Sequence, residues 1–268
     1  MSIMKSDLKN THSWLTTLLC ALIWLSPSFS LTACACTQEE EPDTIDIPEA
    51  PPGLDEQIIC RLGYVVSYNK TTLNPNWVAW HLIGDRVDGI IERHGRPFHE
   101  DEEVPWPRAT LADYKGSGWT RGHICPAADN KWDEQAMYDS FAMTNICPQT
   151  QNLNTGVWNQ IEMACRRWAK KYGDLYIVSG PIYLNQVHET IGENRVVVPE
   201  AFFKVIIHLG ENPKGIGFIC RNNDTHGKKD MYVNSIKQVE RITKYKFFPN
   251  LDEDIAEDVK NQADIKDW

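Results

Sequence analysis

Apolar residues recur at two different spacings along the chain, and the spacing separates predicted strands from predicted helices. Apolar and β-branched residues dominate residues 57–68, and apolar side chains alternate over residues 77–83. Turn-forming residues fill positions 69–76 between these runs, so the region predicts a β-hairpin. Comparable runs predict further strands at residues 119–125, 143–147, 175–179, 195–198, 201–209 and 215–221.

Helical spacing is clearest over residues 154–171, where apolar residues repeat at intervals of three and four and Gly173 follows a basic end. Shorter helices are predicted at residues 133–141 and 235–243. Charged residues, Gly and Pro occupy residues 84–118, which predicts a long surface segment. Because strands and helices follow one another without regular alternation, the expected fold class is α+β.

Composition and charge exclude several classes of protein. The chain has 268 residues, of which 42% are hydrophobic and 24% charged, so it is neither fibrous, nor fully disordered, nor a polytopic membrane protein. The formal net charge is -10, but residues 37–60 hold eight acids without a Lys or Arg. Residues 251–268 hold seven acids and two Lys, and residues 1–36 carry a net charge of +1, which leaves residues 61–250 at +2. A nucleic-acid partner for the central region therefore stays compatible with the charge.

The N-terminal residues have the pattern of a targeting segment. Lys5 and Lys9 precede an apolar run at residues 14–24, which is the order of a secretory signal. A Leu-Thr-Ala sequence then leads to Cys34 and resembles a bacterial lipobox, in which that Cys is lipidated. We therefore predict a lipoprotein signal peptide at residues 1–33, with simple cleavage nearby as the alternative.

The predicted signal peptide sets the expected domains and location. Residues 34–56 predict an acidic, disordered tether, because a segment rich in acids and Pro cannot bury a core. Residues 57–268 are expected to form a single domain. The protein is predicted to be an exported cell-envelope lipoprotein held in the membrane by lipid at Cys34, on the outer-membrane surface. Secretion and a periplasmic location are the alternatives.

Export would allow disulfide bonds, and we expect at least one. Six cysteines remain outside the predicted signal and lipid site, and they allow fifteen pairings. A bridge between Cys125 and Cys147 would brace the candidate site described next, and two separately buried cysteines are the alternative. The six are Cys36, Cys60, Cys125, Cys147, Cys165 and Cys220.

Candidate catalytic residues lie close together between positions 121 and 162. A strand that holds Arg121 and His123 puts both side chains on one face, where the Arg can bind an anion and a neutral His can remove a proton. Asn154 stands at the start of the predicted helix, and its amide oxygen suits Mg²⁺ that keeps most of its waters. Glu162 lies about 12 Å further along such a helix, so it would reach the metal through water. An N-cap role for Asn154 and a solvated position for Glu162 are the alternatives.

These motifs resemble the DNA/RNA non-specific endonuclease family. Arg121-Gly-His123 matches the family's Arg-Gly-His, and residues 144–162 follow its Asn-Pro-Gln-Leu-Asn-Trp-Glu order. Arg61 and residues 76–79 also fit, and the resemblance covers about residues 57–250. It implies a mixed, mainly antiparallel sheet with a ββα-metal, or His-Me, finger at the active site.

The resemblance also implies a role for each residue. His123 would be the general base that activates water, Asn145 would orient its imidazole, and Arg61 and Arg121 would contact phosphate. A structural role for Arg61 is the alternative. One Mg²⁺, for which Mn²⁺ can substitute, would be held by two metal-site residues, the ligand Asn154 and, behind it, Glu162.

The expected substrates are both DNA and RNA, cut to 5′-phosphate and 3′-hydroxyl ends with little sequence preference. No small organic cofactor is expected, and a homodimer stays open. One position departs from the family, because Thr120 stands where an acid usually precedes Arg-Gly-His. The rival interpretation is therefore a catalytically weak nucleic-acid-binding envelope lipoprotein. A structural envelope protein and a phosphodiesterase for small substrates are further alternatives.

Overall fold

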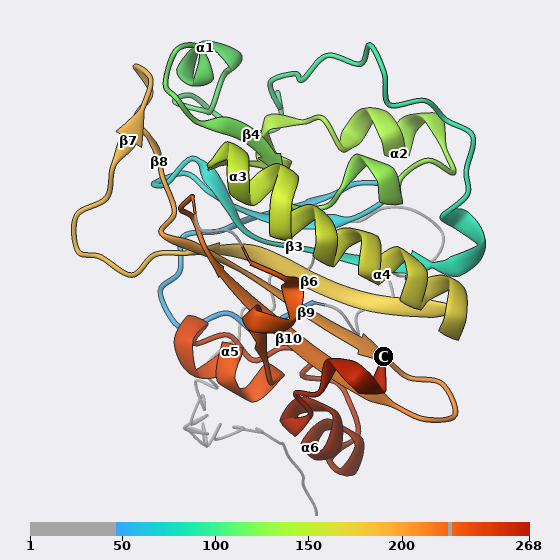
Figure 1. Ribbon diagram of the computed structural model, residues 1–268. Coiled ribbons are helices and arrows are strands. Elements are labelled where there is room, and N and C mark those ends of the chain that lie inside the picture. Colours follow the sequence, from blue (N-terminus) through green and yellow to red (C-terminus); the bar gives the residue numbers. More distant parts are fainter. Residues whose placement is uncertain (1–46, 225–226) are drawn as a thin grey trace, which may run out of the picture. The chain divides into compact units, whose positions relative to one another are not determined.

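The main sheet of the computed structural model has seven strands in the order β1-β2-β3-β6-β9-β10-β11, and neighbouring strands run antiparallel (Figure 1). The structure describes residues 47–224 and 227–268. The strands are β1 (Gln57–Cys60), β2 (Val65–Asn69), β3 (Asn74–Ile83), β6 (Asp174–Ile182), β9 (Ala201–His208), β10 (Lys214–Arg221) and β11 (Val233–Asn234). Together with helices on both faces of the sheet, this arrangement confirms the α+β class.

Helices cover the two faces of this sheet, which is why its strands are apolar on both sides. Helix α4 (Asn159–Tyr172) lies on one face, and α5 (Ile236–Thr243) and α6 (Glu253–Asn261) lie on the other (Figure 1). Along β3, Trp80 belongs to the core under α4 and Trp77 to the core under α5 and α6. We call these the α4 face and the α5–α6 face.

A second, two-stranded antiparallel sheet is inserted between β3 and α4. It pairs β4 (Thr120–His123) with β5 (Ile146–Gln149), in a register that sets Thr120 opposite Gln149. The short helix α2 (Glu134–Asp139) lies between these strands in sequence, and α4 follows β5. Two strands followed by a helix are the ββα order that the family resemblance implied. Two smaller elements complete this region, helix α1 (Leu111–Tyr114) and the ribbon of β7 (Thr190–Ile191) and β8 (Val196–Val197).

Several predicted boundaries were wrong. The strand predicted at residues 57–68 is two strands, because a tight turn closed by Arg61 N–H donating to the Tyr64 carbonyl (2.8 Å) separates β1 from β2. The strand predicted at 143–147 begins as a 3-10 helical turn over Met143–Asn145, and pairing with β4 starts only at Ile146. Turn and strand tendencies alternate over too few residues here for periodicity to separate them.

The folded chain also starts earlier than the predicted boundary at Gln57. Glu49 forms an antiparallel backbone bridge with Lys246, with N···O distances of 2.9 and 3.0 Å. Ile47 and Leu54 pack against the core of the α5–α6 face. The predicted disordered tether was therefore wrong for its last ten residues, which add apolar contacts to the fold.

The remaining predictions for the N-terminal region concern residues that the structure does not describe. The signal peptide, the lipid site at Cys34 and the tether up to residue 46 lie outside the described residues. In the described part of the chain, no helix is both long and apolar enough to cross a membrane.

The cysteines correct one expectation. Four cysteines of the described residues are free and buried, so the bridge considered between Cys125 and Cys147 is not formed. Burial in apolar surroundings raises the pKa of the Cys147 thiol well above its ordinary value, which makes it an inert part of the core. The four are Cys125, Cys147, Cys165 and Cys220.

Candidate active site

Strand β4 carries Arg121 and His123 at the edge of the ββα unit, and one aromatic ring contacts both side chains. The Phe98 ring centroid lies 5.2 Å from that of His123, and the Arg121 guanidinium carbon lies 4.6 Å from the Phe98 centroid. Phe141 meets the imidazole edge-on at 5.1 Å. Phe98 belongs to the irregular segment at residues 84–118, where no periodic pattern marked it as part of a site. The two aromatic rings therefore fix the imidazole by packing.

The environment of His123 keeps its imidazole neutral. Burial, followed by the charges of Arg93 and Arg121, lowers the pKa of His123 to about 3. Its Nε2 is buried, with no hydrogen-bond partner among the described residues. A neutral ring is the protonation state that a general base needs at neutral pH.

Arg93 is a site residue that the sequence did not single out. Its charge acts on His123 and also on Glu162, so it stands within electrostatic range of both. It is exposed and lies in the irregular segment at residues 84–118, where a lone Arg has no distinguishing spacing. Together with Arg121 it makes the surroundings of His123 cationic and suited to an anion.

Close packing explains why Gly stands between Arg121 and His123. A Cβ atom on Gly122 would overlap the side-chain amide of Gln149 on the paired strand β5. Gln149 is fully buried, and neither of its amide atoms has a hydrogen-bond partner among the described residues. A larger residue at position 122 would therefore push β4 and β5 apart beside the imidazole.

The structure places Asn145 differently from the expected contact with the imidazole. Its side chain is fully buried, accepts a hydrogen bond from Cys125 N (2.9 Å) and donates to Cys125 O (2.9 Å) and Ser140 O (2.8 Å). Its backbone carbonyl accepts from Ile124 N (3.0 Å). Asn145 thus holds the chain directly after His123 and positions the imidazole through the backbone.

Asn154 is not the N-cap of the long helix. The helix begins earlier, with α3 (Gln151–Leu153), and Thr150 caps it by accepting from Leu153 N (3.2 Å). Residues 154–158 form a π-helical turn in which Gly156 leaves helical geometry, at φ -96° and ψ -113°. Such turns inside helices are frequent at functional sites. This widened turn separates Asn154 from Glu162, so the distance expected from a continuous α-helix does not apply.

The two polar ends of the Asn154 amide have different surroundings. Its Nδ2 donates to the Thr120 hydroxyl oxygen at 3.0 Å. Its oxygen accepts no hydrogen bond from the residues that the structure describes, and the side chain is half-buried. An amide oxygen with free lone pairs can bind a cation or a water molecule.

Glu162 projects from α4 and also lacks a hydrogen-bond donor within the described chain. Burial raises the pKa of its carboxyl to about 7, although the charge of Lys204 acts in the opposite direction. Lys204 is fully buried, and its ammonium group lies 4.6 and 4.7 Å from the ring centroids of Trp80 and Trp158. A half-buried carboxylate without a hydrogen-bond donor would gain from a bound cation.

A buried ion pair lies beside Glu162. Asp129 accepts a hydrogen bond from Arg166 at 2.8 Å and from Trp80 Nε1 at 3.2 Å, and its side chain is 2% exposed. Both charged groups act on Glu162. The carboxyl of Asp129 is therefore satisfied within the protein, whereas that of Glu162 is left open.

These donors fit a hard divalent cation that keeps much of its hydration shell. No group of three or more His, Cys, Asp or Glu in residues 47–224 and 227–268 is arranged to hold a metal ion. The open donors are instead the amide oxygen of Asn154 and the carboxylate of Glu162. Oxygen donors of this kind match Mg²⁺, which is commonly bound by few protein ligands and several waters.

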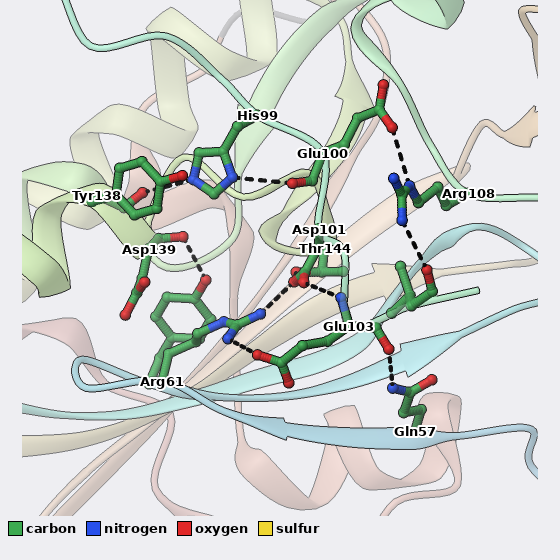
Figure 2. A network of polar contacts seen from close by, with 12 residues as sticks. Gln57, Arg61, His99, Glu100, Asp101, Glu103, Arg108, Tyr138, Asp139 and Thr144 are labelled. Atoms are coloured by element: carbon green, nitrogen blue, oxygen red, sulfur yellow. Dashed lines mark hydrogen bonds and ion pairs between the residues drawn. The ribbon is translucent and has the colours of Figure 1, made fainter. Parts of the chain in front are cut away.

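Arg61 takes part in a different network, shown in Figure 2. Its guanidinium forms an ion pair with Asp101 at 2.6 Å and a second one with Glu103. Burial works against ionisation of Asp101, but the hydrogen bond from Thr144 (2.6 Å) and the Arg61 charge lower its pKa overall. Arg61 thereby ties the irregular segment to the sheet, and these bonds favour the structural alternative over phosphate contact.

Comparisons with known proteins show the family and the fold of this chain. The family model of the DNA/RNA non-specific endonucleases matches residues 41–254. Human mitochondrial nuclease EXOG is 32% identical over 223 residues, which are 77% of this chain and 60% of the relative. Human mitochondrial endonuclease G is 34% identical over 75% of this chain and 72% of its own length. Nuclease C1 of Cunninghamella echinulata var. echinulata is 34% identical over 75% of this chain and 86% of its own length.

A solved structure extends the likeness to three dimensions. It is described as the crystal structure of the EndoG/EndoGI complex and the mechanism of EndoG inhibition, and it superposes with a TM-score of 0.70 at 29% identity. The match covers 75% of this chain and 89% of that chain. The chain spans 58–60% of the length of the EXOG proteins of Xenopus laevis, Homo sapiens and Mus musculus.

Proposed function

Because this chain belongs to the DNA/RNA non-specific endonuclease family, we propose that it is a metal-dependent nuclease that hydrolyses internal phosphodiester bonds of DNA and RNA. The observation that carries the proposal is the neutral, buried imidazole of His123 between two exposed arginines, on a strand joined to Asn154 through Thr120. This combination supports a base and anion-binding groups that act together with open oxygen donors for a cation.

His123 acts as the general base. Its neutral imidazole accepts a proton from water as that water attacks phosphorus, and the phenyl rings of Phe98 and Phe141 hold its plane. Arg121 and Arg93 bind the non-bridging phosphate oxygens, because guanidinium groups pair well with phosphate. Arg61, tied to two carboxylates, holds the segment that carries Phe98.

Two residues would hold the metal. The Asn154 oxygen would be a direct ligand, and Glu162 would bind through water or directly. The metal, Mg²⁺ with Mn²⁺ as a substitute, would stabilise negative charge that develops on the phosphate and on the leaving 3′ oxygen. Asn154 is the first residue of the π-helical turn and Glu162 lies in α4 directly after it, so that turn sets their spacing.

The chemistry of the site implies broad substrate use. Water is the nucleophile, so no 2′-hydroxyl is needed and both DNA and RNA are substrates. Cleavage leaves 5′-phosphate and 3′-hydroxyl ends. The side chains proposed to touch substrate contact phosphate, which carries no base sequence, so sequence preference is weak.

Substitution of His123 tests the proposal. Wild-type protein, His123→Ala and the control His81→Ala are incubated with plasmid DNA and with a structured RNA, in Mg²⁺ and in EDTA. His81 pairs with Asp174 at 2.8 Å and stacks on Tyr176, so its loss should leave cleavage unchanged. We expect His123→Ala to lower the cleavage rate by about 10³-fold, the contribution of a general base.

The same experiment separates the rival function. If wild-type protein retains nucleic acid on a gel but cuts neither substrate in Mg²⁺, the catalytically weak binding protein is the better interpretation. If His123→Ala cuts as fast as wild type, the assignment of the general base is wrong.

We further propose that the protein is exported and lipid-anchored at Cys34. The proposal is supported only by the sequence of the first 46 residues, which lie outside the described residues. Metabolic labelling with a radioactive fatty acid tests it, because the label should be incorporated into wild-type protein and be absent from Cys34→Ala. Equal labelling of the two proteins would contradict it.

A further inference from the structure

Thr120 joins the two strands of the ββα unit to the candidate metal ligand. Its hydroxyl donates a hydrogen bond to the Gln149 carbonyl at 2.8 Å and accepts one from Asn154 Nδ2 at 3.0 Å. Thr120 and Gln149 are directly opposed in the β4–β5 pairing. Three segments distant in sequence therefore meet at a single hydroxyl oxygen.

This chain of hydrogen bonds decides which way the Asn154 amide faces. A hydroxyl has one proton, and here the Gln149 carbonyl, which can only accept, takes it. The Thr120 oxygen can therefore only accept from Asn154, so the NH₂ end of the amide must face it. The two ends of an amide have nearly the same shape, so hydrogen bonding and not packing selects the orientation. The Asn154 oxygen is consequently turned away from Thr120.

The charges that act on Glu162 weaken its attraction for a cation in the free protein. Glu162 is the anionic donor, and the largest charges that act on it are those of Lys204, Asp129, Arg166 and Arg93. Asp129 and Arg166 pair with each other at 2.8 Å, which leaves Lys204 and Arg93 against the single negative charge of Glu162. Thr120 brings the orienting hydrogen bond without a negative charge. A divalent cation entering alone would meet net positive surroundings, whereas a phosphate group would supply both negative charge and oxygen ligands.

We propose that Thr120 is a positioning residue that turns the Asn154 oxygen toward the metal, and that this site takes up its divalent cation together with a substrate phosphate. The inference rests on the proposed function and refines it by stating the order of binding. An acidic side chain at position 120 would accept the same hydrogen bond from Asn154 and add a negative charge. The residue at this position thus tunes how strongly the free site holds its cation.

Binding of Mn²⁺, followed by electron paramagnetic resonance, tests both parts without requiring turnover. The measurements use the full-length protein carrying His123→Ala, which should slow cleavage by about 10³-fold and leaves the proposed ligands in place. Affinity is compared with and without a short DNA duplex, and binding of Mn²⁺ to the duplex alone is subtracted. We expect the duplex to raise Mn²⁺ affinity by about tenfold or more.

Substitutions at position 120 in the same background separate orientation from charge. Thr120→Ser keeps the hydroxyl and should bind Mn²⁺ within about twofold of the parent, whereas Thr120→Val should weaken binding by about fivefold, the effect of one hydrogen bond. Thr120→Asp should tighten binding to the free protein by about tenfold and reduce the effect of the duplex. Thr155→Val is the matched control, because the Thr155 hydroxyl donates to Gln151 O (2.9 Å) in the same helix.

Two results would overturn the inference. Equal Mn²⁺ affinity of folded Thr120→Val and its parent would refute the orienting role, and tight binding to the free protein without a duplex effect would refute joint uptake. If Thr120→Val does not fold, a loss of affinity in folded Thr120→Ser larger than about twofold refutes the orienting role instead. Cleavage by protein with native His123 is measured separately, so failure of the nuclease proposal remains distinguishable from failure of this one.

Discussion

The two faces of the main sheet bury different kinds of side chain. Beneath α4, the sheet and the ββα unit bury the charged side chains of Lys204 and Asp129 and the amide of Gln149. The two amide atoms of Gln149 have no hydrogen-bond partner among the described residues. Both faces also pack aromatic rings, and on the α5–α6 face the Phe247 ring lies 5.2 Å from that of Phe203 between centroids. The alternation of β9 itself separates the two, because Phe203 and Lys204 point to opposite faces.

This contrast separates the part of the molecule that provides stability from the part that holds the site. On the α5–α6 face the buried charge is matched, because Lys260 and Glu240 pair at 3.0 Å. Helix α5 also begins with a complete capping box between Ser235 and Gln238. On the α4 face, the unpartnered amide of Gln149 and the π-helical turn lie in the same stretch of chain as the candidate ligands Asn154 and Glu162. Unsatisfied buried polar groups cost stability, and such groups are expected where they serve chemistry.

The largest expected effect is on the α5–α6 face. Phe247→Ala removes a fully buried ring and should lower the free energy of unfolding by about 3–5 kcal/mol. Cleavage measured well below the new melting temperature should stay within about twofold of wild type, because the ring lies across the sheet from His123. Denaturant unfolding and plasmid cleavage give the two values. A loss of cleavage in fully folded protein would show that the faces are coupled.

Substitution of Arg61 and of Arg121 separates a structural role from a phosphate-binding role on the α4 face. Arg61→Ala leaves the buried Asp101 without its ion-pair partner and should destabilise the protein by about 3 kcal/mol. Arg121→Ala removes an exposed side chain and should instead raise KM by about tenfold, with the melting temperature unchanged. Melting curves and steady-state cleavage of both variants check this. If Arg61→Ala instead raises KM and leaves the melting temperature unchanged, Arg61 contacts phosphate and the structural role is wrong.

A matched pair of glycines tests the two faces with the same added methyl group. In Gly122→Ala the methyl meets the Gln149 side chain beside His123, and cleavage should fall by about 10²-fold as the imidazole shifts. In Gly215→Ala it meets the backbone carbonyl of Val259 in α6, which should cost about 1–3 kcal/mol of stability with cleavage preserved. Equal losses of activity in the two variants would contradict the separation.

The smallest effect concerns pH. Burial holds the pKa of Glu162 at about 7 in the folded protein, above its ordinary value of 4.5. Its contribution to stability is therefore fully present below pH 4.5 and is lost as the pH rises through 7. Without metal, the melting temperature of wild type should fall relative to that of Glu162→Gln as the pH rises from 4.5 to above 7. Added Mg²⁺ should reduce this difference. If the two melting temperatures change in parallel with pH in the absence of metal, the raised pKa of Glu162 is wrong.

Much of the fold and the set of candidate residues could be predicted from the sequence. The Trp side chains at positions 77, 80, 158 and 168 are buried, and they lie in segments whose apolar spacing predicted strands and a helix. The family resemblance carried by Arg121, His123 and the segment up to Glu162 is confirmed by the family match over residues 41–254. These features depend on local spacing, which is written directly in the chain.

Other parts could not be predicted, because they depend on contacts between distant segments. Helix α6 lies in a C-terminal segment that is rich in acidic residues, and no helix was predicted there. It packs on the sheet through a few apolar residues such as Val259. Arg93 and Phe98 lie in an aperiodic stretch and reach the site only when that stretch folds back. Residues 47–56 have the composition of a tether, yet Ile47 and Leu54 find apolar partners.

The sequence by itself determined which chemical groups are available: the imidazole of His123, the guanidiniums of Arg61 and Arg121, an amide and a carboxylate, at the spacing of a known family. Only the tertiary structure decided their protonation states, their ion-pair partners and their orientations. The neutral state of His123, the ion pairs that occupy Arg61 and the orientation of the Asn154 amide follow from Phe98, Asp101 and Thr120, which reach them across the fold. Protonation and hydrogen-bond direction are set by neighbours in space, and one-dimensional spacing carries no information about them.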